Sequence, residues 1–108
     1  PRLLHGDLSS YNIIIKNGKI SGIIDASNSV SGDPMYDLGI IYQYNFDRIH
    51  VMEPFFKGYG EFDMRKVVFY ALITAIWLTN FHGLIYKNEK ELRKDINSIK
   101  YYLSISEE

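Results

Sequence analysis

The stretch HGDLSSYNIIIKNGKISGIID, residues 5–25, decides how this chain is organised. It contains His5 and Asp7, reaches Asn12 a short loop later and ends on Asp25 after two isoleucines. A phosphoryl-transfer site of the kinase type needs one carboxylate for the attacking hydroxyl group, and an amide oxygen and a second carboxylate to hold Mg²⁺ against the phosphates. Asp7 is therefore the candidate catalytic base. Asn12 and Asp25 are the candidate metal ligands, because Mg²⁺ prefers oxygen.

Two strand-like segments lie between the candidate metal ligands. Residues 13–16 and 20–24 are rich in β-branched side chains, and the Asn-Gly pair at 17–18 is a strong hairpin signal because both residues tolerate positive φ. Antiparallel strands joined by a tight turn bring their outer ends together. We therefore expect Asn12 and Asp25 to converge.

The rest of the chain has helical patterns. We expect helices over residues 35–44, 51–59, 64–82 and 89–103. Asp33 should cap the first helix, with Pro34 in its first turn. The third, apolar on most faces, should be a buried central helix that stops at Gly83.

The last helix shows an apolar stripe beside a charged face. The stripe consists of Leu92, Ile96, Ile99 and Leu103, and Asn88 with Glu91 forms a capping-box pattern. We interpret its charged residues as a solvated face: Lys87, Lys90, Arg93, Lys94, Glu89, Glu91 and Asp95. The expected fold is a single, mainly helical α+β domain over residues 1–108, in which a β-hairpin packs on helices.

Composition limits the function classes. The hydrophobic fraction of 46%, with nine Tyr and six Phe, is enough for a core, and the aromatic residues are most simply core. A net charge of −1 gives no electrostatic reason to bind nucleic acid or an anionic membrane surface. The absence of Cys is typical of a reducing cytosol, so we expect a cytoplasmic protein. The longest apolar run, residues 67–78, is far shorter than the ~20 residues that a membrane-spanning helix needs.

Four further polar residues have a structural interpretation. We expect the His5 ring to bond backbone near Asp25 and to hold the loop, because Asp7 is the better-placed base. Asp37 can reach back to amides of the 5–12 loop, or can simply be a favourable charge at a helix N-terminus. His50 and His82 have no partners at metal-ligand spacing, and we interpret both as structural.

Three motifs occur together in this order, at residues 5–14, 22–25 and 32–39. They resemble the aminoglycoside phosphotransferase family of kinase-like enzymes, whose relatives include choline, fructosamine, methylthioribose and homoserine kinases. The resemblance implies the C-terminal lobe of the protein-kinase-like fold. It also implies that Asp7 faces the acceptor hydroxyl, that Asn12 and Asp25 bind Mg²⁺, and that Asp37 supports the catalytic loop.

The chain departs from the family pattern in two places. Residues 26–28, Ala-Ser-Asn, follow Asp25 where relatives often have an aromatic residue. The family's ATP-binding N-terminal lobe does not precede the motif, so we expect a partial C-terminal lobe that is inactive alone. Loss of a neighbouring lobe exposes apolar surface, and we hypothesise that the isolated chain self-associates.

The resemblance implies an ATP- or GTP-dependent, Mg²⁺-dependent small-molecule kinase. It would transfer the γ-phosphoryl group to a hydroxyl of an aminoglycoside-like, choline-like or sugar-like acceptor. One alternative is a protein kinase, although Gly6 replaces the Arg that is typical between His and Asp there. The other is a non-catalytic binding or scaffold module on a kinase fold.

Overall fold

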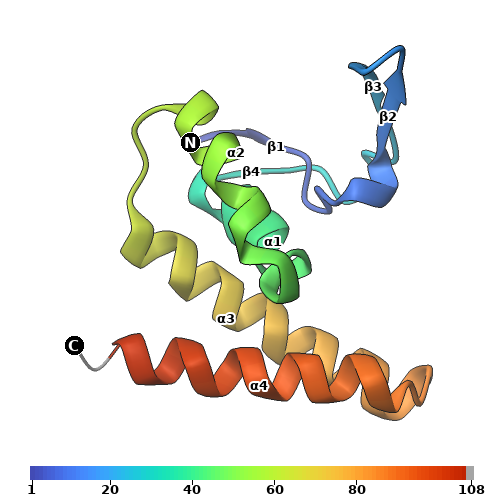
Figure 1. Cartoon of the computed structure of the whole chain (residues 1–108), viewed down its shortest axis with the longest axis vertical. Coiled ribbons are helices and arrows are strands. Elements are labelled where there is room, and N and C mark those ends of the chain that lie inside the picture. Colours follow the sequence, from blue (N-terminus) through green and yellow to red (C-terminus); the bar gives the residue numbers. More distant parts are fainter. Residues whose placement is uncertain (107–108) are drawn as a thin grey trace.

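The computed structural model describes residues 1–106 (Figure 1). Its strands pair as two small antiparallel sheets: β1 (Arg2–Leu4) with β4 (Val30–Gly32), and β2 (Ile13–Lys16) with β3 (Lys19–Ile23). Its helices are α1 (Met35–Tyr44), α2 (Met52–Tyr59), α3 (Met64–Asn80) and α4 (Glu89–Ser106). Shorter helical turns are η1 (Ser10–Asn12), η2 (Phe46–Val51) and the π-helical η3 (Phe81–Ile85). The chain is mainly helical, which is compatible with a kinase-like C-terminal lobe.

The β2–β3 hairpin forms around the predicted turn. Asn17 and Gly18 have φ of 54° and 73°, the left-handed conformation that the turn requires. The Ile24 amide donates to the Asn12 carbonyl at 2.9 Å, so the entrance and the exit of the hairpin lie side by side.

The expectation that this hairpin packs on the helices was wrong. Its isoleucines are largely exposed, with Ile15 at 59% and Ile20 at 65%, and the hairpin projects away from the helices (Figure 1).

The β1–β4 pair joins two segments that are distant in sequence. Arg2 lies opposite Gly32 and Leu4 opposite Val30, and Leu4 is buried. Because β4 leads directly into α1, this pairing fixes the segment after β1 beside the N-terminus of α1. Asp33 accepts a hydrogen bond from the Met35 amide at 3.0 Å and thus acts as the predicted cap.

The core lies between α1, α3 and α4. It is built mainly from buried apolar side chains: Leu38, Ile41, Tyr42, Met52, Val67, Ala71, Ala75 and Tyr102. Gly39 lets α1 approach α3 closely, since a Cβ there would lie 2.5 Å from the Tyr70 Cβ. The close crossing makes α1 the base on which the N-terminal segment rests.

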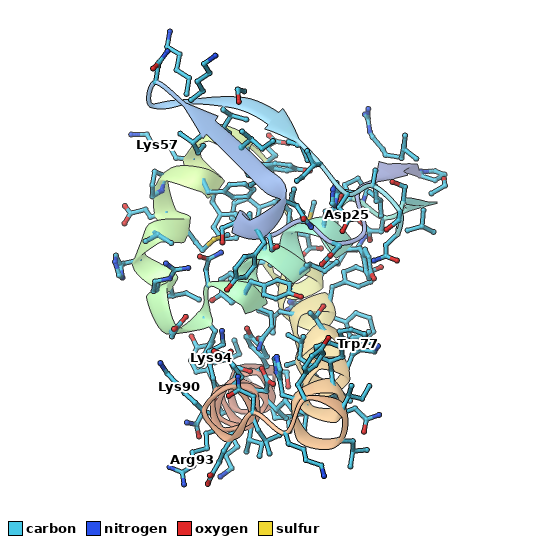
Figure 2. The ribbon with its side chains drawn as sticks, turned by 90° about the vertical axis from the view of Figure 1, so that its right-hand side faces the viewer. Asp25, Lys57, Trp77, Lys90, Arg93 and Lys94 are labelled. Atoms are coloured by element: carbon cyan, nitrogen blue, oxygen red, sulfur yellow. The ribbon has the colours of Figure 1, made fainter. Side chains whose placement is uncertain are left out.

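The prediction that α3 is buried on most faces was wrong. Its buried face is Val67, Val68, Ala71, Ala75 and Leu78, whereas Phe69 and Trp77 are 57% and 60% exposed and are not core residues. Figure 2 shows Trp77 projecting outward from α3. By length and composition alone, the helical segment Met64–Ile85 could cross a membrane, a test that core helices also pass. This helical segment is longer than the apolar run of residues 67–78 because it includes the polar residues on either side of that run.

The predicted end of α3 at Gly83 was also wrong. The helical conformation continues through Gly83 as the π-helical turn and ends at Ile85. A widened turn of this kind is rare and is frequent at functional sites. The Gly83 position packs against Leu92, because a Cβ there would lie 3.5 Å from that side chain.

The buried face of α4 differs from the predicted apolar stripe. Its fully buried residues are Asp95, Ser98 and Tyr102, while Ile96 and Leu103 are exposed. Ser98 and Tyr102 are satisfied internally: the Gln43 side-chain amide donates to the Ser98 hydroxyl at 2.9 Å, and the Tyr102 hydroxyl donates to Gln43 at 2.6 Å. The interpretation of Asp95 as part of a solvated face was therefore wrong.

Asn88 accepts a hydrogen bond from the Glu91 amide at 3.2 Å, as expected of a capping residue. The remaining charges of α4 are largely balanced, with Arg93 paired to Glu89 at 2.9 Å and Lys94 to Glu91 at 3.4 Å. Lys90, Arg93 and Lys94 project at the end of the molecule away from the hairpin (Figure 2). They do not contribute to the loop described next.

Candidate phosphoryl-transfer site

The loop between β1 and β2 is hydrogen-bonded to one carboxylate of α1. Asp37 accepts hydrogen bonds from the backbone amides of His5, to Oδ2, and of Gly6, to Oδ1, both at 2.9 Å. Asp37 lies in the first turn of α1. Two charge-assisted bonds from one side chain fix both the position and the orientation of the peptide plane. The contact expected of Asp37 is thus present, and its part in catalysis stays a prediction.

Gly6 brings the loop against the segment after the hairpin. Its φ is 84°, and a Cβ at this position would lie 2.1 Å from the Asn28 carbonyl oxygen. That separation is well inside van der Waals contact, so neither the backbone conformation nor the space admits a side chain. Gly6 therefore fixes the distance between the two segments that carry Asp7 and Asp25.

The His5 ring links the same two segments. Its Nδ1 accepts from the Asp7 amide at 3.1 Å, and its Nε2 lies 2.7 Å from the Ile24 carbonyl oxygen. A backbone N–H can only donate and a carbonyl can only accept, so both bonds form only in the neutral ring with its proton on Nε2. The ring is therefore occupied at both nitrogens and has none left for a substrate.

Asn12 orients Asp7 from the far end of the loop. Its side-chain amide donates to the Asp7 carbonyl at 2.8 Å and to the Asp7 carboxylate at 3.3 Å. Asn12 is buried, whereas Asp7 is half-buried. Because the amide nitrogen is engaged, the side-chain oxygen of Asn12 is the atom left to act as a ligand.

Asp25 stands at the exit of the hairpin in a strained conformation. Its φ is 57°, which is uncommon for a residue with a side chain and is often found at functional sites. One carboxylate oxygen accepts from the Ser27 hydroxyl at 2.7 Å, and the side chain is exposed. Figure 2 shows Asp25 where the hairpin meets the rest of the chain.

These donors fit Mg²⁺ in kind. Among residues 1–106, no group of three or more His, Cys, Asp or Glu side chains is arranged to hold a metal ion. Mg²⁺ is commonly held by one or two carboxylates together with substrate phosphates and water, so an amide oxygen and a carboxylate are a sufficient protein contribution. The residues able to hold it are Asn12 and Asp25.

Asp7 opens onto a cleft of about 760 Å³. Its wall comes from the N-terminal loops, α1, α3 and the π-helical turn, and aromatic residues predominate: Tyr11, Tyr36, Tyr44, Trp77 and Phe81. Burial, and then the negative charges of Asp7 and Asp95, raise the pKa of Tyr44 to about 12. Tyr44 therefore stays a neutral hydrogen-bonding group in the cleft wall at ordinary pH.

His82 also lines this cleft, at the π-helical turn. Its Nδ1 lies 2.6 Å from Oδ2 of Asp95, whose side chain is fully buried. Burial raises the pKa of Asp95, and the hydrogen bond and charge of His82 act in the opposite direction.

Sequence reasoning missed the cleft residues Tyr44 and His82, and it missed Asp95 as the partner of His82. The signal available for Asp95 was its spacing from Ser98 and Tyr102, which places the three on one helix face. Tyr44 and His82 had no comparable signal, because only the folded chain brings α1 and η3 to the same cleft.

Comparisons with known proteins show which family the sequence matches. A model of the phosphotransferase enzyme family matches residues 1–70. An aminoglycoside 3'-phosphotransferase of Enterococcus faecalis is 34% identical over 77 residues, which are 68% of this chain and 29% of the relative. An aminoglycoside 3'-phosphotransferase of Staphylococcus aureus is 32% identical over 77 residues, again 68% of this chain and 29% of the relative. The chain thus spans less than a third of the length of these curated relatives, and no solved structure matches it.

Proposed function

The chain belongs to the phosphotransferase enzyme family, and from that premise we propose that it carries the catalytic loop of a small-molecule kinase. The reaction is transfer of the γ-phosphoryl group of ATP or GTP to a hydroxyl group of the acceptor. The observation that carries the proposal is the loop geometry: Asp37, His5 and Asn12 together hold Asp7 at the cleft.

Asp7 is the residue proposed to meet the acceptor. Its carboxylate receives the hydrogen bond, and later the proton, of the attacking hydroxyl group. Since the transition state of phosphoryl transfer is loose, positioning matters more than early proton removal. The hydrogen bond from the Asn12 side-chain amide restricts the rotation of the Asp7 carboxylate. It leaves the other oxygen of Asp7 for the acceptor.

Asn12 and Asp25 are proposed to hold Mg²⁺ by their side-chain oxygens. The ion, when bound, supplies positive charge that neutralises the phosphate oxygens. The Ser27 hydroxyl holds one oxygen of Asp25 and thereby orients the other. The Asn12 carbonyl, bonded to Ile24, keeps the two donor segments adjacent.

The cleft suggests which acceptors to test. Aminoglycosides come first because the two relatives are named for them. Asp7 is the sole carboxylate among the cleft-lining residues of the described chain, and the wall is aromatic. Choline and neutral sugars are therefore proposed beside the polycations, since aromatic faces attract both cations and sugar rings.

We propose that the chain works with a nucleotide-binding lobe, as the family resemblance implies. Residues 1–108 by themselves are then expected to show no turnover. We propose the binding of ATP or GTP and of Mg²⁺ for the complete protein. A cytoplasmic location is also proposed for the complete protein, from the absence of Cys. Turnover by a purified 1–108 chain would overturn this part.

The test is nucleotide-dependent ADP or GDP release by the complete protein with Mg²⁺. The acceptors are kanamycin, choline, glucosamine and glucose. Asp7→Asn should lower acceptor-stimulated turnover by about a hundredfold or more, the scale of a lost general base. Asp47→Asn, the same change at an exposed carboxylate outside the loop, should leave it unchanged.

Two results would contradict the proposal. Equal turnover by Asp7→Asn and the unmodified protein would remove the role of Asp7. Failure to bind Mg²⁺-nucleotide at all would favour a non-catalytic scaffold module.

A further inference from the structure

His82 is a polar cleft residue that the proposed reaction leaves unused. It lines the cleft beside Trp77 and Phe81, yet its Nδ1 is engaged by Asp95. Residues 1–106 form no hydrogen bond to its Nε2. Both residues lie beyond residue 70, outside the segment that the family model matches.

The pair is built in a way that a purely structural contact does not require. Asp95 is fully buried, and its Oδ1 has no hydrogen-bond partner among the described residues. A buried carboxylate with one unsatisfied oxygen is costly, and replacing such a pair by apolar residues is often neutral or stabilising. The fold therefore tolerates a destabilising group directly behind a histidine that lines the cleft.

We propose that His82, held by Asp95, is an acceptor-binding residue, whose Nε2 accepts a hydrogen bond from a hydroxyl or ammonium group of the acceptor. This inference rests on the proposed function. Asp95 is a positioning residue, because it reaches the acceptor only through the ring.

The chemistry follows from the ring atoms. When the Asp95 carboxylate is ionised it can only accept, so Nδ1–H of His82 donates to it and Nε2 carries the lone pair. The negative charge behind the ring increases the basicity of Nε2 and favours a donor in front of it. A hydroxyl or ammonium group supplies that donor, whereas phosphate and carboxylate groups do not. The aromatic side chains of the cleft can only stack on an acceptor ring, whereas a hydrogen bond to Nε2 would also fix the orientation of that ring.

Two substitutions separate the ring's two nitrogens. His82→Asn places an amide N–H where Nδ1 stands, so it keeps the Asp95 bond and removes Nε2. His82→Gln places polar atoms near Nε2 and does not reach Asp95 in the same way. A structural role predicts normal behaviour of His82→Asn, whereas the acceptor-binding role predicts a specific loss.

The first readout is the ¹⁵N signal of Nε2 in the complete protein labelled at histidine, assigned by its loss in His82→Asn. Kanamycin, choline or glucose is added without nucleotide. We expect at least one of them to shift this signal, with the His50 signal unchanged as the internal control. No shift with any of the three overturns the inference.

The second readout is kinetic. His82→Asn should raise the acceptor KM about tenfold, the effect of one lost hydrogen bond to a polar group, with the nucleotide KM and the melting temperature unchanged. An unchanged acceptor KM overturns the inference. Acceptor-stimulated turnover without a shift of the Nε2 signal would contradict the role of His82 and keep the proposed kinase function. A shift of the signal without turnover would keep the binding role of His82 and contradict the kinase function.

Discussion

Asp37 holds the backbone amide of His5 at 2.9 Å across 32 positions of sequence, and this bond joins the first turn of α1 to the loop that carries Asp7. The carboxylate binds a second amide, that of Gly6, with its other oxygen. The two residues that precede Asp7 are therefore held by a side chain from a distant segment.

Replacing Asp37 should loosen the loop in two steps. Asp37→Asn keeps one acceptor and points an NH₂ at the other amide, while Asp37→Ala removes both acceptors. We expect losses of about 1–3 kcal/mol in the free energy of unfolding, larger for Ala, because backbone donors lose a charged partner. Urea denaturation of the complete protein measures this. Equal stability of Ala and Asn variants would contradict the two-bond geometry.

Gly6 and Gly18 offer a matched pair. Both have positive φ, 84° and 73°, but a Cβ at Gly18 meets nothing within 4 Å, whereas one at Gly6 would lie 2.1 Å from the Asn28 carbonyl. Gly18→Ala should cost about 1 kcal/mol from conformation alone, and Gly6→Ala several times more. Thermal unfolding of the two variants makes the comparison. Similar losses would mean that the loop moves freely away from Asn28.

The Gln43 network should be sensitive to a single hydroxyl. Tyr102→Phe leaves the Gln43 carbonyl oxygen without its 2.6 Å partner in the core. The expected loss is about 1–3 kcal/mol, because an unsatisfied buried acceptor retains its desolvation penalty. Tyr101→Phe is the control, since Tyr101 is 45% exposed. Denaturant midpoints that agree for the two variants would contradict this account.

Asp95 should make stability fall as the pH rises. Its pKa is raised above the ordinary 3.8, chiefly by burial, while His82 and Lys94 oppose the shift and Glu91 adds to it. The folded chain thus retains a proton that the unfolded chain releases near that value, so stability is lost as the pH rises through the folded pKa. Relative to Asp95→Asn, the unmodified protein should lose stability over this range. A difference that is constant with pH, measured by urea denaturation, would contradict it.

The exposed apolar residues of α3 predict association of the isolated chain. Phe69 and Ile76 are 57% and 55% exposed on a helix otherwise packed on α1 and α4. We expect residues 1–108 to form dimers or larger species, and the double substitution Phe69→Ser, Ile76→Ser to shift them toward monomer. Light scattering at several concentrations measures the mass. A monomer at all of them would contradict the prediction.

Local sequence signals predicted the elements near the site. The features that depend on packing between distant segments were not predicted. The Asn-Gly turn and the Asp33 cap each act within a few residues, so the hairpin and α1 could be predicted from sequence. The β1–β4 pairing joins residues about 28 apart and has no local signature. A polar network fills the centre of the α4 interface because Gln43 satisfies Ser98 and Tyr102. Of the predicted apolar stripe, Leu92 and Ile99 are therefore only partly buried, and Ile96 and Leu103 are exposed.

The candidate site shows the same division. The hairpin signal predicted that the chain segments at Asn12 and Asp25 converge, and the backbone bond from Ile24 to Asn12 confirms that these segments are adjacent. The roles of Asp7, Asn12 and Asp25 stay predictions. The cleft opposite them is formed by side chains from several elements. Neither His82 nor Tyr44 could be assigned to it without the packing of α1 against α3.

The left-handed backbone conformation of Asp25 does not require the carboxylate that is proposed to bind the ion. Asparagine adopts this conformation as readily as aspartate does, and one nucleotide change converts an aspartate codon into an asparagine codon. Such a chain would keep its hairpin and its Gly6 contact while losing the carboxylate proposed to hold the ion. Descendants of this chain that have lost the proposed activity can therefore retain its backbone, and the identity of that one side chain would record the loss.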